Sequence, residues 1–207
     1  MDDLRKEYSK FDLNESQLRK NPLDQFKIWF DETRNSDIPE PNAMVLSTVG
    51  QDLKPSSRVV LLKNITEEGF VFFTNYQSRK GHDLKQNANA CLLFFWDKLE
   101  RQVRIEGVVK PIEVSLSDQY FYSRPILSQI GSLISPQSHR IESRKELQEK
   151  FQYYEAHPDE IKRPEHWGGY CLMPEYFEFW QGRENRLHDR LIYHRVNHDW
   201  EIGRLAP

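Results

Sequence analysis

The sequence predicts an α+β protein in which a mostly antiparallel β-barrel carries helices on its outside. Three observations lead to this fold class. Short runs rich in β-branched and aromatic residues recur from residue 43 onwards, turn sequences separate them, and helical patterns occur at a few places instead of alternating with every strand. We therefore expect one domain over residues 21–207, preceded by a mobile N-terminal arm over residues 1–20.

The composition is that of an ordinary folded protein. Of the 207 residues, 38% are hydrophobic and 13% aromatic, which suffices for one well-formed core. The formal net charge of −3 excludes a general attraction to nucleic acid, so any basic site has to be local. The apolar runs are too short to cross a bilayer and residues 1–10 lack the apolar core of a signal peptide, so we expect a soluble, cytoplasmic protein without a membrane partner. Cys91 and Cys171 have apolar neighbours, as buried thiols do.

The first predicted element is a helix over residues 21–33. Asn21 can cap this helix, Pro22 suits its first position, and its apolar side chains share one face: Leu23, Phe26, Trp29 and Phe30. A meandering antiparallel sheet is expected to follow, with strands over residues 43–49, 57–65, 70–75, 90–96 and 101–112.

Further helices are expected between and after these strands. Their predicted ranges are residues 78–89, 115–124 and 143–157. Ser78 opens the first of these helices, and Ser143 with Glu146 forms a capping box at the start of the last. The final third of the chain returns to strands, over residues 168–174, 176–181, 190–196 and 200–205.

Cations recur where the predicted strands and helices end. Arg58 and Lys63 bracket an apolar run that belongs in a core, so both charges should lie near the ends of that run. Arg79 and Lys80 lie at a helix N-terminus, where free backbone N–H groups and the helix dipole favour an anion. These positions indicate either bound anions or cations that are simply exposed to solvent.

A second polar group surrounds residue 125. Tyr120, Arg124 and Ser128 are spaced four residues apart, which places them on one helix face only if the helix continues through the Arg124–Pro125 bond. Proline disfavours helix in the residue before it. Gln137 and Ser138 offer short polar groups in an expected loop.

The most informative segment is EFWQGRENRLHDR, residues 178–190. If its end is extended, Arg186, His188 and Arg190 point to one side of a strand, where they face either solvent or an anionic ligand. Trp180 is then either a core residue or a ring that packs on a flat cofactor.

Several other chemistries lack their sequence patterns. The chain has no glycine-rich dinucleotide loop, no Walker lysine and no nucleophile elbow. His188, His194 and His198 fit no common zinc spacing, so we expect no metal. The residues alone therefore indicate a barrel with local anion sites, which describes a binder of phosphorylated planar molecules.

Ordered motifs along nearly the whole chain resemble those of the pyridoxamine 5′-phosphate oxidase family: SSRVVLLK, FTNYQSRKGHDL, LERQVRIEG, YFYSRP, SQIGS, HWGGY, EFWQGRENRLHDR and WEIGRLAP. The resemblance implies an FMN-binding split β-barrel, mostly antiparallel and Greek-key-like, that works as a homodimer with FMN in the cleft between subunits. It implies oxidation of pyridoxamine 5′-phosphate and pyridoxine 5′-phosphate to pyridoxal 5′-phosphate by molecular oxygen, with release of hydrogen peroxide and, from the amine, ammonia.

The resemblance also implies roles for individual residues. The FMN contacts are Arg58, Val59, Val60, Leu61, Leu62, Lys63, Phe73, Thr74, Arg79, Lys80, Gln102, Trp180 and Arg190, with Gln137 and Ser138 from the partner subunit. The substrate contacts are Lys63, Tyr120, Arg124, Ser128, Arg186 and His188, with Arg5 and Tyr8 from the N-terminal arm. Arg186 and His188 are the expected catalytic residues: Arg186 holds the pyridine ring over the flavin, and His188 hydrogen-bonds or handles a proton at the reacting side.

The chain departs from the family pattern at a few positions. Phe73 stands where tyrosine is common, Ile126 where a basic residue is usual, Leu133 where tryptophan is usual, and Glu40 where aspartate is frequent. The first three bear on FMN contact, phosphate binding and packing near the cleft. Two other functions stay open: a different split-barrel FMN oxidoreductase, and a non-catalytic carrier of pyridoxal 5′-phosphate.

Overall fold

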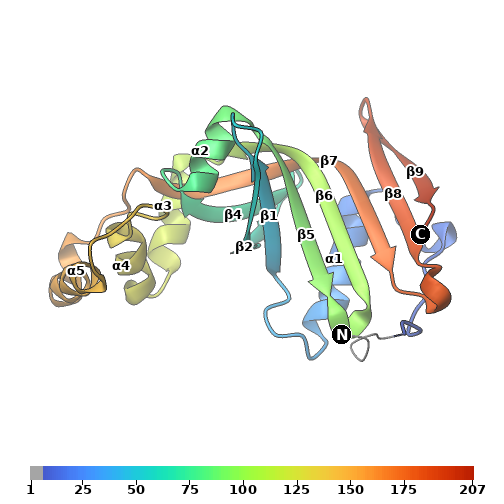
Figure 1. The fold of residues 1–207 in the computed structure, drawn as a ribbon, viewed down its shortest axis with the longest axis horizontal. Helices are drawn as coiled ribbons and strands as arrows, with labels where there is room; N and C mark the ends of the chain where they lie inside the picture. The colour runs from blue at the N-terminus through green and yellow to red at the C-terminus, as the bar shows by residue number, and fades with distance from the viewer. Residues whose placement is uncertain (1–6) are drawn as a thin grey trace.

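The structure of the chain, a computed structural model, describes residues 7–207. Its strands form one antiparallel sheet, and helices lie around that sheet (Figure 1). The strands are β1 (Ala43–Val49), β2 (Pro55–Leu61), β3 (Asn64–Ile65), β4 (Phe70–Asn75), β5 (Asn89–Trp96), β6 (Arg101–Pro111), β7 (Trp167–Gln181), β8 (Asp189–Val196) and β9 (Asp199–Leu205). The α-helices are α1 (Pro22–Arg34), α2 (Arg79–Gln86), α3 (Val114–Ser123), α4 (Ile126–Ile134) and α5 (Arg144–Ala156).

The sheet curls until its two edges meet at Leu62 and Lys63. The strand order is β2-β1-β5-β6-β7-β4-β3, so β2 and β3 lie at opposite ends although they are consecutive in sequence. The Leu62 N–H donates to the Asn42 carbonyl (2.9 Å) beside β1, whereas the Lys63 N–H donates to the Val71 carbonyl (2.8 Å) in β4. The hydrogen-bonded ladder stays open at this point while the chain itself closes the barrel. The predicted antiparallel split barrel with outer helices is confirmed.

The pairing of the strands differs from a simple meander. β1 pairs with β5 and β4 pairs with β7, so strands distant in sequence lie side by side. The two strands predicted over 168–174 and 176–181 are one long strand, β7, which pairs with β4, β6 and β8. The register shifts opposite Glu106 and Gly107, where Glu175 is the extra residue of a bulge next to Pro174. Proline has no N–H to donate to the ladder, and a bulge tolerates that loss.

Helix α1 packs its apolar face against the main core of the curled sheet. Its start is the predicted one, because the Asn21 side chain accepts a hydrogen bond from the Leu23 N–H (2.9 Å). The Phe26 ring is fully buried, with its centroid 4.8 Å from that of Phe70 and 5.0 Å from that of Phe94. The apolar face read from the sequence is thus the face that forms the main core.

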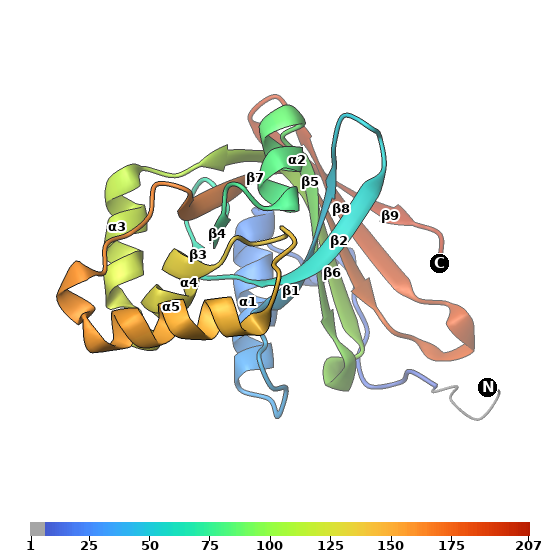
Figure 2. The ribbon, with the colours of Figure 1, turned by 60° about the vertical axis from the view of Figure 1, so that its left-hand side comes forward.

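Helices α3, α4 and α5 form a separate layer at one end of the molecule, beyond β4 and β7 (Figures 1 and 2). Phe121, Ile130 and Trp167 form the centre of a second, smaller core there. The chain breaks between α3 and α4 at Arg124–Pro125, as expected for the residue before a proline. α4 has no counterpart among the predicted helices.

The described part of the N-terminal arm, residues 7–20, runs along the sheet. Leu13 is buried in the main core, and the Tyr193 hydroxyl donates to the Arg19 carbonyl (2.7 Å). The predicted mobility of the arm stays a prediction, and Arg5 lies outside the described residues. Within residues 7–207, every helix is too short or too polar to span a bilayer.

Candidate active site

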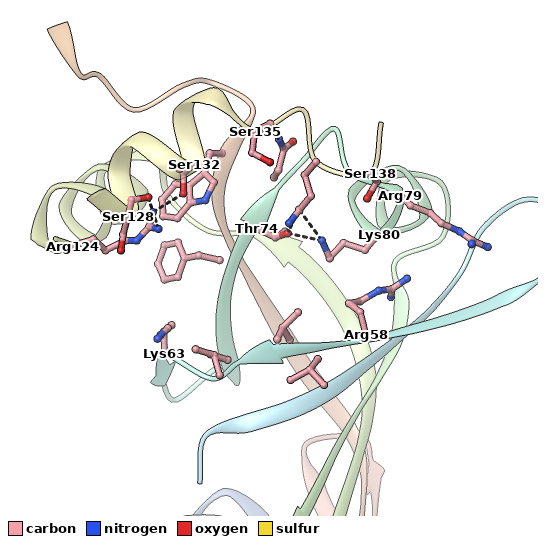
Figure 3. A pocket seen from close by; sticks show the side chains of 18 of the residues that line it. Arg58, Lys63, Thr74, Arg79, Lys80, Arg124, Ser128, Ser132, Ser135 and Ser138 are labelled. Atoms are coloured by element: carbon pink, nitrogen blue, oxygen red, sulfur yellow. Dashed lines mark hydrogen bonds between the residues drawn. The ribbon is translucent and has the colours of Figure 1, made fainter. Parts of the chain in front are cut away.

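A cavity of about 890 Å³ lies where β2 and β4 face α2, α3 and α4. Many of the residues predicted for the site line it together: Arg58, Val59, Val60, Leu61, Lys63, Phe73, Thr74, Arg79, Lys80, Tyr120, Arg124, Ser128, Gln137 and Ser138. Figure 3 shows two groups of cations on different sides of this cavity, with Lys63 and Arg124 on one side and Arg58, Arg79 and Lys80 on the other.

The start of α2 brings Lys80 into the cavity. Ser78 caps the helix, since its hydroxyl accepts from the Gly81 N–H (3.4 Å). A Cβ at position 81 would lie 2.1 Å from the Tyr76 carbonyl oxygen, so only glycine lets the helix begin this close to the end of β4. Local sequence therefore determines where the Lys80 side chain leaves the helix.

Lys80 is a buried ammonium group that has hydroxyl and amide partners. Its Nζ donates to Thr74 Oγ1 (2.9 Å), Ser78 Oγ (3.1 Å) and Gln137 Oε1 (2.9 Å). Burial, followed by the nearby charge of Arg58, lowers the pKa of Lys80 to about 8. A buried cation without a carboxylate partner is expensive unless an anion joins it.

Contacts with β1 and α2 hold the Arg58 guanidinium in place. Its NH1 donates to the Leu46 carbonyl (3.0 Å) and to Thr48 Oγ1 (2.8 Å), and its NH2 lies 3.9 Å from the Asp83 carboxylate. Burial lowers the pKa of Arg58, and Asp83 opposes that shift. Among the described residues, Asp83 is the one carboxylate within 4 Å of the cavity's cations.

Arg124 forms the second cationic side of the cavity. Its NH1 donates to Ser132 Oγ (2.9 Å) and its NH2 to the Ser128 carbonyl (2.8 Å). The guanidinium lies 4.7 Å from the centroid of the Trp167 ring. Burial lowers the pKa of Arg124, and within the described chain no carboxylate approaches this group to 4 Å. The pattern therefore placed Tyr120, Arg124 and Ser128 together correctly although the helix between them is broken.

The remaining predicted residues do not line this cavity. Leu62 is buried in the main core instead. The others gather along β6, β7 and β8 and are called here the β8 cluster: Tyr8, Gln102, Trp180, Arg186, His188 and Arg190. Trp180 pairs with Gln102 on one side and with Arg190 on the other, so these three side chains share one face of the sheet.

Aromatic contacts connect the N-terminal arm to the β8 cluster. The Tyr8 ring centroid lies 5.7 Å from that of Trp180 and 6.0 Å from that of His188. The Trp180 and His188 rings are 4.6 Å apart. Tyr8 packs on Gly182, where a Cβ would come within 2.7 Å of the tyrosine ring.

Residues 186–188 are not part of a strand, and β8 begins at Asp189, one residue before the start predicted for it. Asn185 and Arg186 have φ angles of 55° and 62°, in the left-handed region, and lie in a short turn before β8. Leu187, the residue after this turn, is 68% exposed. The condition under which Arg186, His188 and Arg190 would share one strand face is therefore not met at Arg186, because left-handed residues end the extended geometry.

His188 accepts a hydrogen bond from a defined donor. Its Nδ1 lies 3.0 Å from the backbone nitrogen of Arg183, which can only donate. Nδ1 is therefore unprotonated, and in the neutral ring the proton lies on Nε2. Burial, followed by the charge of Arg186, lowers the pKa of His188 below its ordinary value, which favours this neutral form.

Glu178 is a residue of this region that the sequence patterns did not single out. It is 3% exposed and accepts hydrogen bonds from Arg190 Nε (2.7 Å) and Arg104 NH2 (2.7 Å). Burial alone would raise the pKa of Glu178, but the bonds from Arg190 and Arg104 outweigh burial and hold the pKa below its usual range. The available signal was an acidic residue on the same strand face as Trp180.

Comparison with known proteins gives the family of the chain. Residues 30–158 match the model of the pyridoxamine 5′-phosphate oxidase family, and residues 167–207 match that of the pyridoxine 5′-phosphate oxidase C-terminal dimerisation region. The chain belongs to the pyridoxamine 5′-phosphate oxidase family.

Similar proteins carry the same family name over their full length. The pyridoxine/pyridoxamine 5′-phosphate oxidases of Salinibacter ruber and Burkholderia multivorans are 50% and 51% identical to the chain. Both comparisons cover 99% of this chain and 98% of the relative. The expectation that the chain is an enzyme of the pyridoxamine 5′-phosphate oxidase family is confirmed.

Solved structures agree with the fold. PhzG from Burkholderia lata, in complex with tetrahydrophenazine-1-carboxylic acid, has a TM-score of 0.92 and 30% identity, covering 96% of this chain and 99% of PhzG. A pyridoxamine 5′-phosphate oxidase-related, FMN-binding protein from Nostoc punctiforme has a TM-score of 0.74 and 16% identity, covering 90% and 98%. The second likeness bears on the fold alone.

The structure also locates two expected contact residues and three of the residues that depart from the family pattern. Gln137 and Ser138, expected from a partner subunit, line the cavity of their own chain, and Gln137 contacts Lys80 directly. Contrary to the expectation, these two residues thus reach the cavity from the same chain and not from a partner subunit. Ile126 and Leu133 do not line the cavity, whereas Phe73 does and stacks on Tyr120 at 4.0 Å between centroids.

Proposed function

We propose that the protein oxidises pyridoxine 5′-phosphate and pyridoxamine 5′-phosphate to pyridoxal 5′-phosphate, with FMN as cofactor. The alcohol and one O2 give the aldehyde and hydrogen peroxide; the amine with one O2 and one water gives the aldehyde, hydrogen peroxide and ammonia. The observation that carries this proposal is the single cavity with two cationic sides and almost no carboxylates. Such a cavity suits two phosphate groups at once.

The side of the cavity around Lys80 fits the FMN phosphate. Lys80 lacks a carboxylate partner in the described chain although it is buried, and Thr74 and Gln137 already orient its ammonium group. Arg58 and Arg79 add guanidinium donors, and Val59 adds apolar surface for a flat ring. When bound, FMN would accept a hydride from the substrate and pass the electrons to oxygen.

The side around Arg124 fits the substrate phosphate. Lys63, Tyr120 and Ser128 surround this guanidinium in the cavity lining. The stacked rings of Tyr120 and Phe73 add a flat apolar wall to the cavity. We assign these residues to binding and orientation, which bring the reacting carbon of the substrate to a fixed position.

The β8 cluster completes the site in our proposal, through a homodimer. Trp180, Arg186, His188 and Arg190 all lie in the segment that matches the family's dimerisation region. None of them lines the cavity of its own chain, so a second copy is the natural source. In the dimer, Arg186 holds the pyridine ring, His188 donates from Nε2, and the arm with Arg5 and Tyr8 excludes water.

The deciding experiment adds each substrate to the purified, FMN-loaded protein under air. We expect pyridoxal 5′-phosphate and hydrogen peroxide to form in equal amounts, measured by absorbance and by a coupled peroxidase assay. A flavin-loaded protein that forms neither product would contradict the proposal. Turnover of tetrahydrophenazine-1-carboxylic acid alone would favour a different FMN oxidoreductase, and binding of pyridoxal 5′-phosphate without flavin or turnover would favour a carrier.

A further inference from the structure

Ser132 lies on the face of α4 that borders the cavity, one turn after Ser128 (Figure 3). It is the last residue of the motif SQIGS, but no role was predicted for it. Its hydroxyl accepts a hydrogen bond from Arg124 NH1 at 2.9 Å. Ser132 therefore touches the cation that we assign to the substrate phosphate.

The hydrogen bond recorded for the Ser132 hydroxyl uses it as an acceptor and not as a donor. Its Oγ is the acceptor for Arg124, because a guanidinium can only donate. Among residues 7–207, the structure records no acceptor for the hydroxyl hydrogen of Ser132. That hydrogen remains available to a ligand in the cavity.

A purely helical role for this hydroxyl does not fit the contacts. A serine inside a helix commonly donates back to the carbonyl four residues earlier. Here that carbonyl belongs to Ser128 and accepts from Arg124 NH2 instead (2.8 Å). Successive turns of α4 thus hold both terminal nitrogens of one guanidinium.

The corner between α3 and α4 is built to keep Arg124 in this place. Gln129 is buried, and its Nε2 donates to the Arg124 carbonyl (2.8 Å). Trp167 lies against the guanidinium at 4.7 Å. With its backbone, its flat face and both nitrogens held, the arginine keeps its remaining N–H groups for an anion.

We propose that Ser132 is a further residue of the substrate-phosphate site, which positions Arg124 and donates its own hydroxyl hydrogen to a phosphate monoester. This inference rests on the proposed function, because it assumes that the Arg124 side of the cavity receives the substrate phosphate. Phosphate monoesters carry several strong acceptor oxygens, so a hydroxyl donor beside an arginine matches them.

The test titrates pyridoxal 5′-phosphate, and pyridoxal without the phosphate, into the FMN-loaded protein. Loss of one hydrogen bond to a charged group predicts that Ser132→Ala weakens pyridoxal 5′-phosphate binding about tenfold. Pyridoxal binding and FMN affinity should stay unchanged. Ser132→Thr keeps the hydroxyl and should bind like the wild type, as should Ser115→Ala, an exposed serine of α3 outside the cavity lining.

Equal affinity for pyridoxal 5′-phosphate in Ser132→Ala and the wild type would overturn the inference, as would an equal loss for pyridoxal. Ser132→Cys, a weaker donor of similar size, provides the same comparison if the alanine variant does not fold. The titration needs no turnover. A wild type that binds the phosphate through Ser132 but oxidises neither substrate would contradict the proposed function and leave the inference standing.

Discussion

The backbone N–H of Arg183 donates a 3.0 Å hydrogen bond to Nδ1 of His188. This contact decides what the imidazole can do, because it leaves Nε2–H as a donor in the neutral ring. A ring in this state presents a hydrogen rather than a lone pair to whatever lies beyond Nε2. We infer that His188 acts as a hydrogen-bond donor to the substrate and not as the group that removes a proton.

This role predicts that His188→Gln keeps most of the activity, because its amide can still donate. His188→Leu, which has no donor, should lower kcat/KM about tenfold or more. The measurement is kcat/KM for pyridoxine 5′-phosphate in both variants. If the glutamine variant lost as much activity as the leucine variant, His188 would be acting as a base.

The lowered pKa of His188 also predicts the shape of the pH profile. Protonation would place a hydrogen on Nδ1 facing the Arg183 N–H, so the wild type should lose activity as the pH falls through this lowered pKa, below the ordinary histidine value of about 6.5. The folded state disfavours this proton, so stability from the neutral ring is present above that ordinary value and is lost as the pH falls. His188→Gln should remove this acid limb.

Lys80 predicts a flavin affinity that depends on the phosphate. Lys80→Ala should weaken FMN binding about 10- to 100-fold, the effect of losing a charge-assisted hydrogen bond in a buried site. Riboflavin, which has no phosphate, should bind both proteins alike. Quenching of flavin fluorescence measures both affinities, and Lys85→Ala, an exposed lysine of the same helix, is the matched control. An equal loss for riboflavin would mean that Lys80 supports the fold and not the phosphate.

The pKa of about 8 for Lys80 gives this binding a pH dependence. In our proposal the FMN phosphate binds the charged ammonium, so FMN affinity should fall as the pH rises above about 8. The flavin-free protein should behave in the opposite way. Unfolded lysine keeps its proton up to about 10.5, so between these values the unfolded state holds more protons and folding stability rises with pH. Chemical unfolding at pH 8 and pH 10 tests the sign.

Local patterns in the sequence located the elements well where one short segment carries the whole signal. The bounds of β1 and β4 are those predicted, and Asn21 and Ser78 cap the helices expected to start there. Pairing was harder, because alternation along β1 or β4 defines their faces but not their distant partners. The closure at Leu62 and Lys63 depends on contacts from both ends of the sheet.

Site residues were predictable where a charge is unusual at its position in the sequence. They were less predictable where a residue's role depends on contacts with other elements. Lys80 at a helix N-terminus is such an anomaly, and it lies in the cavity. No role was predicted for Ser132 or Glu178, since their importance comes from Arg124 and Arg190 reaching them from other elements. The left-handed turn at Arg186 was hidden by a pattern that also fits a strand.

A methyl group added at Gly131 should stabilise the protein and weaken substrate binding. Gly131 lies inside α4 and lines the cavity, and a Cβ there would meet no atom within 4 Å apart from its chain neighbours and the backbone of its own helix. Gly131→Ala should therefore stabilise the protein by about 0.5–1 kcal/mol, the usual gain inside a helix. Because Gly131 lines the cavity, the methyl should take up space there and raise KM for pyridoxine 5′-phosphate. Thermal unfolding and steady-state kinetics measure the two effects; an unchanged KM would place the substrate away from α4.

The composite site predicts that two inactive variants restore each other. Arg124→Ala removes a cavity residue, and Arg186→Ala removes a residue of the β8 cluster. In a dimer of one copy each, one site carries both defects and the other has neither, because in our proposal each site combines the cavity of one subunit with the β8 cluster of its partner. Random reassembly of an equal mixture makes half the dimers mixed, each with one of two sites intact, so activity should recover to about a quarter of the wild type.

A second mixture controls for simple stabilisation by reassembly. Arg124→Ala with Lys63→Ala combines two defects of the same cavity, so every site in every dimer keeps at least one of them. We expect no recovery in that mixture. The two mixtures are unfolded, refolded together with FMN and assayed alongside each parent. Recovery of activity in both mixtures would trace the effect to refolding. Recovery in neither would mean that the cavity and the β8 cluster serve the reaction within one chain. In that case the β8 cluster would have to act without lining the cavity of its own chain.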